Sequence, residues 1–412
     1  MKAKRLFVTT ILTICILAGF TSLNRVNADL KDTDKDLYKD IELFSDAVTI
    51  IQSDYVEDVE SKKIVYGALE GMLASLDEYS QFMDPDSYKE MEVETKGEFG
   101  GLGIEISVRD GILTVIAPID GTPAHKAGIK AKDKIVGIDG EPTRDITLSE
   151  AVKKLRGKPK TKIDLKILRE GEEKLLDFTV VRDIIRIKSI KISEMIDENI
   201  GYIRLVEFQE NTPEELEDKL RRLEDDKMAA LILDLRNNPG GLLDVAYEVS
   251  DIFLPKGKVV VSLKGRVPIQ NKVYLAHGKR SFTNFPLVVL VNEGSASASE
   301  IVAGALQDNK RGIILGSKTF GKGSVQTVIP LRDGSAVRLT TASYYTPSGN
   351  SISHKGIMPD IEVKLEEPEA KETDETDQDQ KVQEEPTDQI VYDNQLQAAI
   401  DMLKKDFSLR KI

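Results

Sequence analysis

The chain of 412 residues contains no tryptophan, one cysteine and three histidines. The single cysteine, Cys15, excludes an internal disulfide bond. The histidines, His125, His277 and His354, form no pair at metal-ligand spacing, so no metal site and no cofactor are predicted. An excess of basic residues is also missing: 57 Lys and Arg stand against 70 Asp and Glu, which argues against a nucleic-acid partner.

The acidic charge is concentrated near the C-terminus. Residues 366–388 hold 11 acidic and two basic residues, which gives −9 of the net charge of −13 and leaves the rest of the chain at −4. This segment lacks aromatic residues and is predicted to be a disordered linker. Behind it, residues 389–412 carry Leu396, Ile400 and Leu403 at helical spacing and predict a terminal helix.

The first 28 residues have the pattern of a targeting segment. Three basic residues precede an apolar run over residues 6–20, and Val26 and Ala28 are small residues at positions −3 and −1 of a cut before Asp29. An uncleaved membrane anchor is the alternative, although the run is short for a span of about 20 residues. Either interpretation predicts export to a bacterial cell envelope or the extracellular space, with membrane contact only through this segment.

Residues 29–95 are predicted to form a helical part. Apolar residues such as Leu37, Ile41 and Phe44 recur there at spacings of three and four. The helices are interpreted either as a cap on a larger domain or as an arm that pairs with a second copy of the chain. Both interpretations remain open, and a homodimer is one of them.

Residues 96–182 change to short strands separated by glycine turns. The loop Gly100-Gly101-Leu102-Gly103-Ile104, the stretch 123–129 and the turn at Asp139-Gly140 occur in the order typical of a PDZ domain, which this segment resembles. The resemblance implies that a peptide adds a strand to the sheet edge and that loop N–H groups bind its C-terminal carboxylate. The residues implied are Gly101, Leu102, Gly103 and Ile104.

Residues 183–365 are predicted to form an α/β core. The runs 229–235 and 286–291 are almost continuously apolar, as strands of a buried sheet are. A helix is expected over 212–223, with Thr212 as N-cap in a capping box with Glu215. Two further strands are expected around the turn at 332–335 and predict a hairpin.

Three serines, at positions 295, 297 and 299, follow the predicted strand at 286–291. A serine at a helix start lies near free N–H groups that stabilise an oxyanion, which suits a nucleophile, although an ordinary N-cap is the alternative. The nucleophile needs a base. His277 lies 20 residues before Ser297 and beyond a strand, whereas Lys322, between two glycines, is a base if burial lowers its pKa from about 10.4 toward 7–8.

Taken together, these segments resemble the carboxy-terminal processing proteases. The matching motifs are 295–301, 319–326 and 234–241, and the resemblance covers about residues 35–365 plus the terminal helix. It implies that Ser297 is the nucleophile, Lys322 the general base and Gln326 the residue that orients the lysine. It also implies oxyanion donors at Ala298 and at Gly240 or Gly241, whereas chemistry alone leaves Ser295 and Ser299 open as nucleophiles.

The sequence therefore predicts a multidomain chain of α/β and α+β type. Its expected function is that of an exported serine endopeptidase whose PDZ domain captures apolar C-terminal tails of protein substrates. The alternative is an inactive PDZ adaptor or scaffold. The presence of Ser297, Lys322 and Gln326 together argues against that alternative, because an inactive core has no chemical need for all three.

Overall fold

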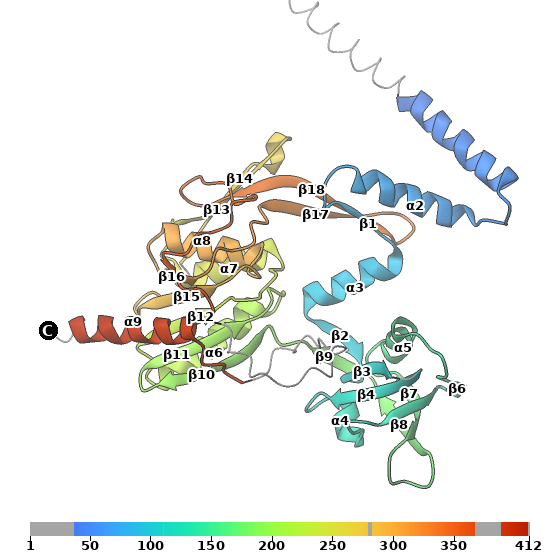
Figure 1. The fold of residues 1–412 in the computed structure, drawn as a ribbon, viewed down its shortest axis with the longest axis horizontal. Helices are drawn as coiled ribbons and strands as arrows, with labels where there is room; N and C mark the ends of the chain where they lie inside the picture. The colour runs from blue at the N-terminus through green and yellow to red at the C-terminus, as the bar shows by residue number, and fades with distance from the viewer. Residues whose placement is uncertain (1–36, 110, 279–281, 367–388, 411–412) are drawn as a thin grey trace, which may run out of the picture. The chain divides into compact units, whose positions relative to one another are not determined.

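The computed structural model describes residues 37–109, 111–278, 282–366 and 389–410, and it divides into two compact units after Asp84 (Figure 1). The predicted signal peptide or anchor at 1–28 and the linker at 367–388 lie outside the described residues. Among the helices that are described, none is both long enough and apolar enough to cross a membrane.

The first unit consists of a helix over residues 37–54, α2 (Ser61–Ala74) and the short strand β1 (Gln81–Met83). The prediction of a helical part is thus confirmed. The rings of Tyr66 and Phe82 pack edge to face at 4.7 Å between centroids, and Leu73 is buried. The helix α3 (Pro85–Lys96) belongs to the second unit, so the part predicted for residues 29–95 is shared between the two units.

The PDZ-like segment of the second unit contains an antiparallel sheet with the strand order β3-β4-β5-β7-β8, and β6 pairs with β5. Its elements are β3 (Ile104–Arg109), β4 (Ile112–Pro118), α4 (Pro123–Ala127), β5 (Lys134–Ile138), β6 (Glu141–Pro142), α5 (Leu148–Leu155), β7 (Lys162–Leu168) and β8 (Leu176–Val181). A two-stranded ribbon of β2 (Glu98–Gly101) and β9 (Asp183–Arg186) joins this segment to its neighbours in the chain.

A six-stranded sheet with the order β10-β11-β12-β15-β16-β19 forms the middle layer of the core. Its strands are β10 (Ile190–Asp197), β11 (Ile200–Leu205), β12 (Ala230–Asp234), β15 (Leu287–Val291), β16 (Ile313–Gly316) and β19 (Ile361–Glu362). All pairs are parallel except β10 with β11. Every residue of β12 and β15 is buried, which confirms the buried strands predicted from their apolar runs.

Helices cover both faces of this sheet. Leu231 and Leu233 pack in a cluster with α6 (Thr212–Asp225), α7 (Leu243–Phe253) and α8 (Ala298–Asp308). Ala230 and Ile232 alternate with them and pack on the other face against α9 (Asn394–Arg410), the predicted terminal helix, drawn in red in Figure 1. The core is therefore a three-layer α/β/α arrangement.

The predicted capping box at Thr212 is wrong. Asn211 is the N-cap of α6 and makes no side-chain cap bond, whereas the Thr212 hydroxyl accepts the Gln209 N–H at 2.9 Å in the preceding turn. The Glu215 carboxylate instead accepts a hydrogen bond from Ser189 at 2.7 Å. These partners lie outside the helix, so the local pattern could not reveal them.

A second sheet of the core contains β13 (Val259–Gly265), β14 (Lys272–Leu275), β17 (Ser324–Pro330) and β18 (Ala336–Tyr345). A single helical turn, η1 (Pro268–Gln270), lies between β13 and β14. β17 and β18 form the predicted antiparallel hairpin, and the end of β18 also pairs with β13. A register shift between Val325 and Gln326 interrupts the regular alternation of side chains at the start of β17.

Candidate active site

The residues predicted to be catalytic meet in one groove of about 920 Å³ in the second unit. Ser297, Lys322 and Gln326 all line it, as do Gly240 and Gly241. His277, the other base considered, is not among its lining residues, and its Nδ1 atom lies 2.5 Å from the Tyr247 hydroxyl. Among the described residues, no group of three or more His, Cys, Asp or Glu could hold a metal ion.

The three serines of the strand–helix junction have different environments. Ser295 is fully buried, and its hydroxyl donates to the Leu235 carbonyl at 2.8 Å. Ser299 is also fully buried, and its hydroxyl donates to the Asn238 carbonyl at 2.9 Å. Ser297 is half-buried and lines the groove. Two of the three hydroxyls are thus committed to the core.

The backbone of Ser297 has an unusual conformation. Its φ of 53° and ψ of −110° lie in a region that residues with a Cβ rarely adopt. Such outliers cost about 1–3 kcal/mol and cluster at functional sites. Ser297 is the N-cap of α8, so the chain turns sharply between β15 and the helix at this residue.

Glu300, in the first turn of α8, connects the nucleophile candidate to the base candidate. Its side chain is fully buried and accepts the N–H groups of Ser297 at 3.0 Å, Gly321 at 2.7 Å and Lys322 at 2.9 Å. It also accepts the Thr319 hydroxyl at 2.6 Å. Burial raises the pKa of the Glu300 carboxyl, and these four hydrogen bonds oppose the rise.

Glu300 lies inside the motif 295–301, but the sequence alone predicted no role for it. A local signal was present, because an acidic residue three positions after a serine is the pattern of a capping box. What the pattern could not show is that both carboxylate oxygens bind groups of the segment 319–322.

Gln326 lies on β17 beside the groove. Its amide nitrogen donates to Ser324 at 3.1 Å and to Thr340 at 2.8 Å. Its amide oxygen is buried and has no hydrogen-bond partner among the residues that the structure describes. A buried acceptor without a donor is costly, so this oxygen is a candidate to receive a further N–H in the groove.

The glycine loop after β12 approaches the start of α8 closely. A Cβ at Gly240 would lie 2.8 Å from the Ser297 Cβ and 2.9 Å from the Ala298 nitrogen, so only glycine fits there. The Gly240 N–H donates to the Asn238 side chain at 2.9 Å. The N–H groups of Gly241 and Ala298 have no acceptor among the described residues.

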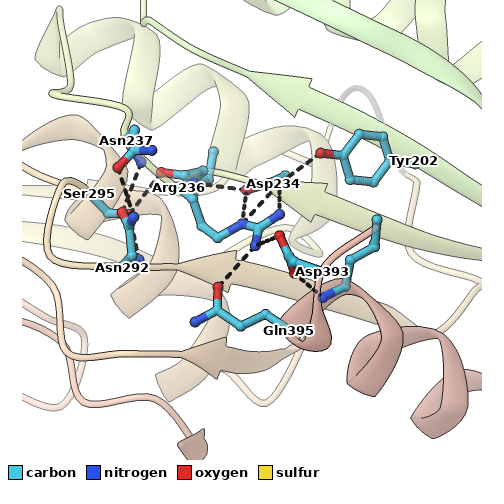
Figure 2. A network of polar contacts seen from close by, with 10 residues as sticks. Tyr202, Asp234, Arg236, Asn237, Asn292, Ser295, Asp393 and Gln395 are labelled. Atoms are coloured by element: carbon cyan, nitrogen blue, oxygen red, sulfur yellow. Dashed lines mark hydrogen bonds and ion pairs between the residues drawn. The ribbon is translucent and has the colours of Figure 1, made fainter. Parts of the chain in front are cut away.

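A buried ionic network holds the start of this loop (Figure 2). Arg236 donates to both oxygens of Asp234, which also accepts the Tyr202 hydroxyl at 2.7 Å. The same guanidinium donates to Asp393 at 2.7 Å and Gln395 at 2.9 Å, at the beginning of α9. Although burial disfavours its charge, Asp234 and Asp393 hold the pKa of Arg236 above its usual value. Sequence reasoning missed this network.

The predicted peptide-binding loop lines a small cavity of its own, about 90 Å³ in volume. Gly101 ends β2, Ile104 begins β3, and both line the cavity with Leu102 and Gly103. The N–H groups of Leu102 and Gly103 have no acceptor in the part of the chain that the structure describes. The remaining lining residues are mostly apolar and are Phe99, Ile106, Val152, Leu155 and Arg156.

Comparison with protein families gives three consecutive matches. Residues 199–363 match the model of peptidase family S41, residues 90–168 match the PDZ domain, and residues 18–87 match the activating protease CtpB N-terminal domain.

Two proteins of known family agree with these matches, and one solved structure is also similar to this chain. The carboxy-terminal-processing protease of Bartonella bacilliformis is 47% identical over 344 residues, which are 82% of this chain and 78% of that one. The carboxy-terminal processing protease CtpA of Bacillus subtilis is 38% identical over 359 residues, 87% of this chain and 75% of that one. The solved photosystem II D1 C-terminal processing protease is 31% identical, with a TM-score of 0.44 over 78% of this chain and 92% of its own.

The order of the matched segments agrees with the order of the motifs along the chain, from helical part through PDZ domain to core. With 47% identity to a protease of this kind over most of both chains, this chain belongs to the carboxy-terminal processing proteases, serine-type peptidases of family S41 with a PDZ domain.

Proposed function

We propose that this protein is an exported serine endopeptidase that binds the C-terminal tails of proteins on its PDZ domain and cleaves them with Ser297 and Lys322. One observation carries the proposal. Of the three candidate serines, Ser297 alone lines the groove, and it shares that groove with Lys322. Glu300 accepts N–H groups from both residues, which fixes the two segments relative to each other.

The chemistry follows from this arrangement. The neutral Lys322 amine takes the proton of the Ser297 hydroxyl while Oγ attacks the scissile carbonyl, and the resulting ammonium gives the proton to the leaving amine. Water, activated by the same amine, then releases the acyl group from Ser297. Gln326 acts as a positioning residue, because its buried amide oxygen can accept an N–H of Lys322.

The oxyanion is stabilised by the N–H groups of Ala298 and Gly241, for which the described residues offer no other acceptor. Gly241 is favoured over Gly240, since the Gly240 N–H is occupied by Asn238. The Gly240 carbonyl accepts the Phe208 N–H at 2.8 Å. The C=O and N–H of a trans peptide point in opposite directions, so the Gly241 N–H points away from Phe208.

The dyad is tested by peptide hydrolysis with three variants. Ser297→Ala and Lys322→Arg are expected to lose essentially all activity, because arginine stays protonated and cannot accept the serine proton. The pH dependence of kcat/KM should rise through an apparent pKa well below about 10.4. The matched variant Ser299→Ala should stay active, since its hydroxyl only bonds the Asn238 carbonyl. An active Lys322→Arg enzyme would contradict the assignment of Lys322 as the base. An inactive wild type with intact tail binding would favour the inactive adaptor.

Tail recognition is tested with matched peptides that end in a free carboxylate or an amide. The Leu102 and Gly103 N–H groups can bind the carboxylate, and the cavity of about 90 Å³ admits a small apolar side chain. Charge-assisted hydrogen bonds of this kind are worth roughly 1.5–3 kcal/mol, so amidation should lower kcat/KM at low substrate by about ten- to a hundredfold. Equal rates would show that the PDZ domain does not select tails.

Export and pairing complete the proposal. Cleavage before Asp29 is tested by N-terminal sequencing of the secreted or envelope-bound protein, where an intact N-terminus would indicate an anchor. Pairing with a second copy is supported by apolar side chains on the first unit that stay at least 41% exposed, namely Leu37, Ile41, Phe44, Ile51 and Tyr55. Sedimentation equilibrium should show a dimer that replacement of these residues by serine converts to a monomer.

A further inference from the structure

Asn238 is a buried residue of the glycine loop after β12, and the reaction described above gives it no part. Its relative exposure is 0%, and it stands directly before Pro239 and Gly240. Burying an amide side chain is costly unless its oxygen and nitrogen both have hydrogen-bond partners. The partners of Asn238 therefore show what this side chain holds in place.

The side chain of Asn238 binds the chain at two points. Its Oδ1 atom accepts the Gly240 N–H at 2.9 Å, as in turns where an asparagine oxygen replaces a backbone carbonyl. Its Nδ2 atom donates to the carbonyl of Leu205, the last residue of β11, at 2.9 Å. Three residues further on, the Phe208 N–H donates to the Gly240 carbonyl at 2.8 Å. The segment 205–208 thus holds the loop both directly and through Asn238.

The main-chain carbonyl of Asn238 binds the segment of the nucleophile. It accepts the Ala296 N–H at 3.0 Å and the Ser299 hydroxyl at 2.9 Å, and these residues lie on either side of Ser297 in the sequence. The bond from Ala296 does not depend on the Ser299 side chain. Asn238 is therefore joined to the glycine loop by its side chain and to the start of α8 by its main chain.

These contacts determine where the Gly241 N–H points. Gly240 has a φ of 110°, and a glycine imposes little conformational preference of its own. The direction of the following peptide group is therefore set by the hydrogen bonds of Gly240, namely its N–H to Asn238 and its carbonyl from Phe208. Without the Asn238 oxygen, Gly240 would be held on one side only, and the Gly241 N–H could turn away from the groove.

We propose that Asn238 is a positioning residue, whose side chain occupies the Gly240 N–H and so directs the Gly241 N–H toward the oxyanion that forms at Ser297. This role depends on the proposed Ser297–Lys322 chemistry. Asn238 exchanges no proton and forms no covalent bond with the substrate. It acts through the geometry of the loop alone.

Such positioning affects the transition state more than the bound substrate. The carbonyl oxygen of the substrate carries only a partial charge and becomes an oxyanion when Oγ adds to the carbonyl carbon. A hydrogen bond to the developing charge is stronger than one to the neutral carbonyl, so a misdirected N–H lowers kcat more than it raises KM.

The test compares two variants of Asn238 with a matched asparagine elsewhere. Asn238→Ala removes both side-chain bonds and is expected to lower kcat by roughly ten- to a hundredfold, with KM within about twofold of the wild type. Asn238→Ser should lose less, because a serine hydroxyl can accept the Gly240 N–H in the same kind of turn. In the control Asn309→Ala, an amide that donates to the Val259 carbonyl at 2.8 Å is lost at the far end of α8, and kcat should stay unchanged.

A second measurement separates positioning from general distortion of the groove. With a peptide aldehyde, Oγ of Ser297 adds to the aldehyde carbon, the serine proton passes to Lys322, and the aldehyde oxygen becomes the negative oxygen of the adduct. The peptide alcohol of the same sequence has no carbonyl and binds without forming an adduct. Asn238→Ala should raise the inhibition constant of the aldehyde by about the factor by which kcat/KM falls, and leave that of the alcohol unchanged. If Asn238→Ala does not fold, Asn238→Ser allows the same comparison with a smaller factor.

Normal kcat and normal aldehyde inhibition in Asn238→Ala would overturn the role of Asn238. Equal weakening of aldehyde and alcohol would do the same, since it would show a distorted groove, as would equal losses in Asn238→Ser and Asn238→Ala or a similar loss in Asn309→Ala. If Ser297→Ala is inactive while Asn238→Ala is normal, only the role of Asn238 is disproved. If Ser297→Ala is active, the proposed function itself fails.

Discussion

At the scale of single residues, Glu300 is the group on which the active-site geometry depends most. One buried carboxylate accepts hydrogen bonds from the helix start that carries Ser297 and from the loop that carries Lys322. All four groups are donors, so only a side chain with two acceptor oxygens satisfies them. The distance between nucleophile and base is thereby linked to the charge state of one buried residue.

Glu300→Gln is expected to lower kcat by about a hundredfold or more and the free energy of unfolding by about 1–3 kcal/mol, because an amide NH2 would face N–H donors. Peptide hydrolysis and urea unfolding measure the two effects. Glu150→Gln is the matched control. Glu150 also accepts the N–H of its N-cap, Thr147 at 3.0 Å, but on an exposed helix of the PDZ domain. Equal activity of the two variants would contradict the role assigned to Glu300.

The Glu300 carboxyl should also affect how the stability of the protein changes with pH. Its pKa is raised in the folded protein, chiefly by burial, above the ordinary value of 4.5. A group with a raised folded-state pKa contributes stability that is fully present below the unfolded value and is lost as the pH rises through the folded value. The stability advantage of the wild type over Glu300→Gln should therefore shrink between pH 4 and pH 7. An advantage that grows over this range, measured by urea unfolding, would show that the hydrogen bonds outweigh burial.

The choice among the three serines shows why residue roles were harder to predict than residue positions. The hydroxyls of Ser295 and Ser299 are bound by carbonyls 60 and 61 residues away in the sequence. No local pattern reports such partners, so chemistry alone left all three serines open. The strained backbone of Ser297 is equally invisible, because it results from how β15 and α8 are packed rather than from a preference of serine.

At the scale of elements, the sequence was most informative where the pattern of apolar residues within one segment is enough to predict that the segment is buried. The strands β12 and β15 were predicted because each is apolar along its whole length, and α9 because its apolar residues recur at helical spacing. The N-cap of α6 was not predicted correctly, because the hydroxyl of Thr212 accepts a hydrogen bond from the preceding turn. The contact between α9 and Arg236 was not predicted either, since Arg236 lies 157 residues before Asp393 in the sequence.

The helix α9 is joined to the core through its first residues. Asp393 receives the Arg236 guanidinium at 2.7 Å and also accepts the Leu396 N–H at 2.8 Å, as an N-cap does. Below it, Leu396, Ala399, Ile400 and Leu403 are buried against the sheet. Because Arg236 precedes the loop of Gly240 and Gly241, α9 supports one side of the active site from the far face of the sheet.

Asp393→Ala is expected to lower the free energy of unfolding by about 1–3 kcal/mol, since it removes both a helix cap and a partner of a buried cation. Asp393→Asn keeps an acceptor for the cap and should lose less. Hydrogen exchange of α9 amides should accelerate in the same order. Lys404→Ala, which breaks the partly exposed pair with Asp197, serves as the control and should leave exchange unchanged. Faster exchange in that control would show that α9 is not held by its first turn.

At the scale of the whole molecule, described residues that precede and follow the acidic segment are hydrogen-bonded to each other. The Glu366 N–H donates to the Asn394 side chain at 3.2 Å, and the Asn394 amide donates to the Lys364 carbonyl at 2.7 Å. Glu366 and Asn394 are therefore neighbours, which permits a much shorter connection between them. Loop closure changes by only about 0.6 kcal/mol for each doubling of loop length.

Replacing residues 367–388 by a short Gly/Ser bridge is therefore expected to leave peptide hydrolysis within a few-fold of the wild type, because the composition of the segment cannot build a core. The unfolding midpoint should also stay close to that of the wild type. A control chain that ends at Glu366 removes α9 as well and should lose both activity and stability. A large loss of activity with the bridge alone would show that the acidic segment takes part in catalysis.

The backbone of Ser297 has a consequence for how this enzyme balances reactivity against robustness. The strain of about 1–3 kcal/mol at that residue weakens the entire fold, yet it is what turns the hydroxyl into the groove. Ser297→Gly removes the Cβ that causes the strain, whereas Ser297→Ala keeps it. Both variants should be inactive, but the glycine variant should melt at a higher temperature than the alanine variant. The residue that makes the protein reactive would then also be a residue that lowers its thermal stability. The inactive glycine variant would be the more stable of the two for capturing substrates.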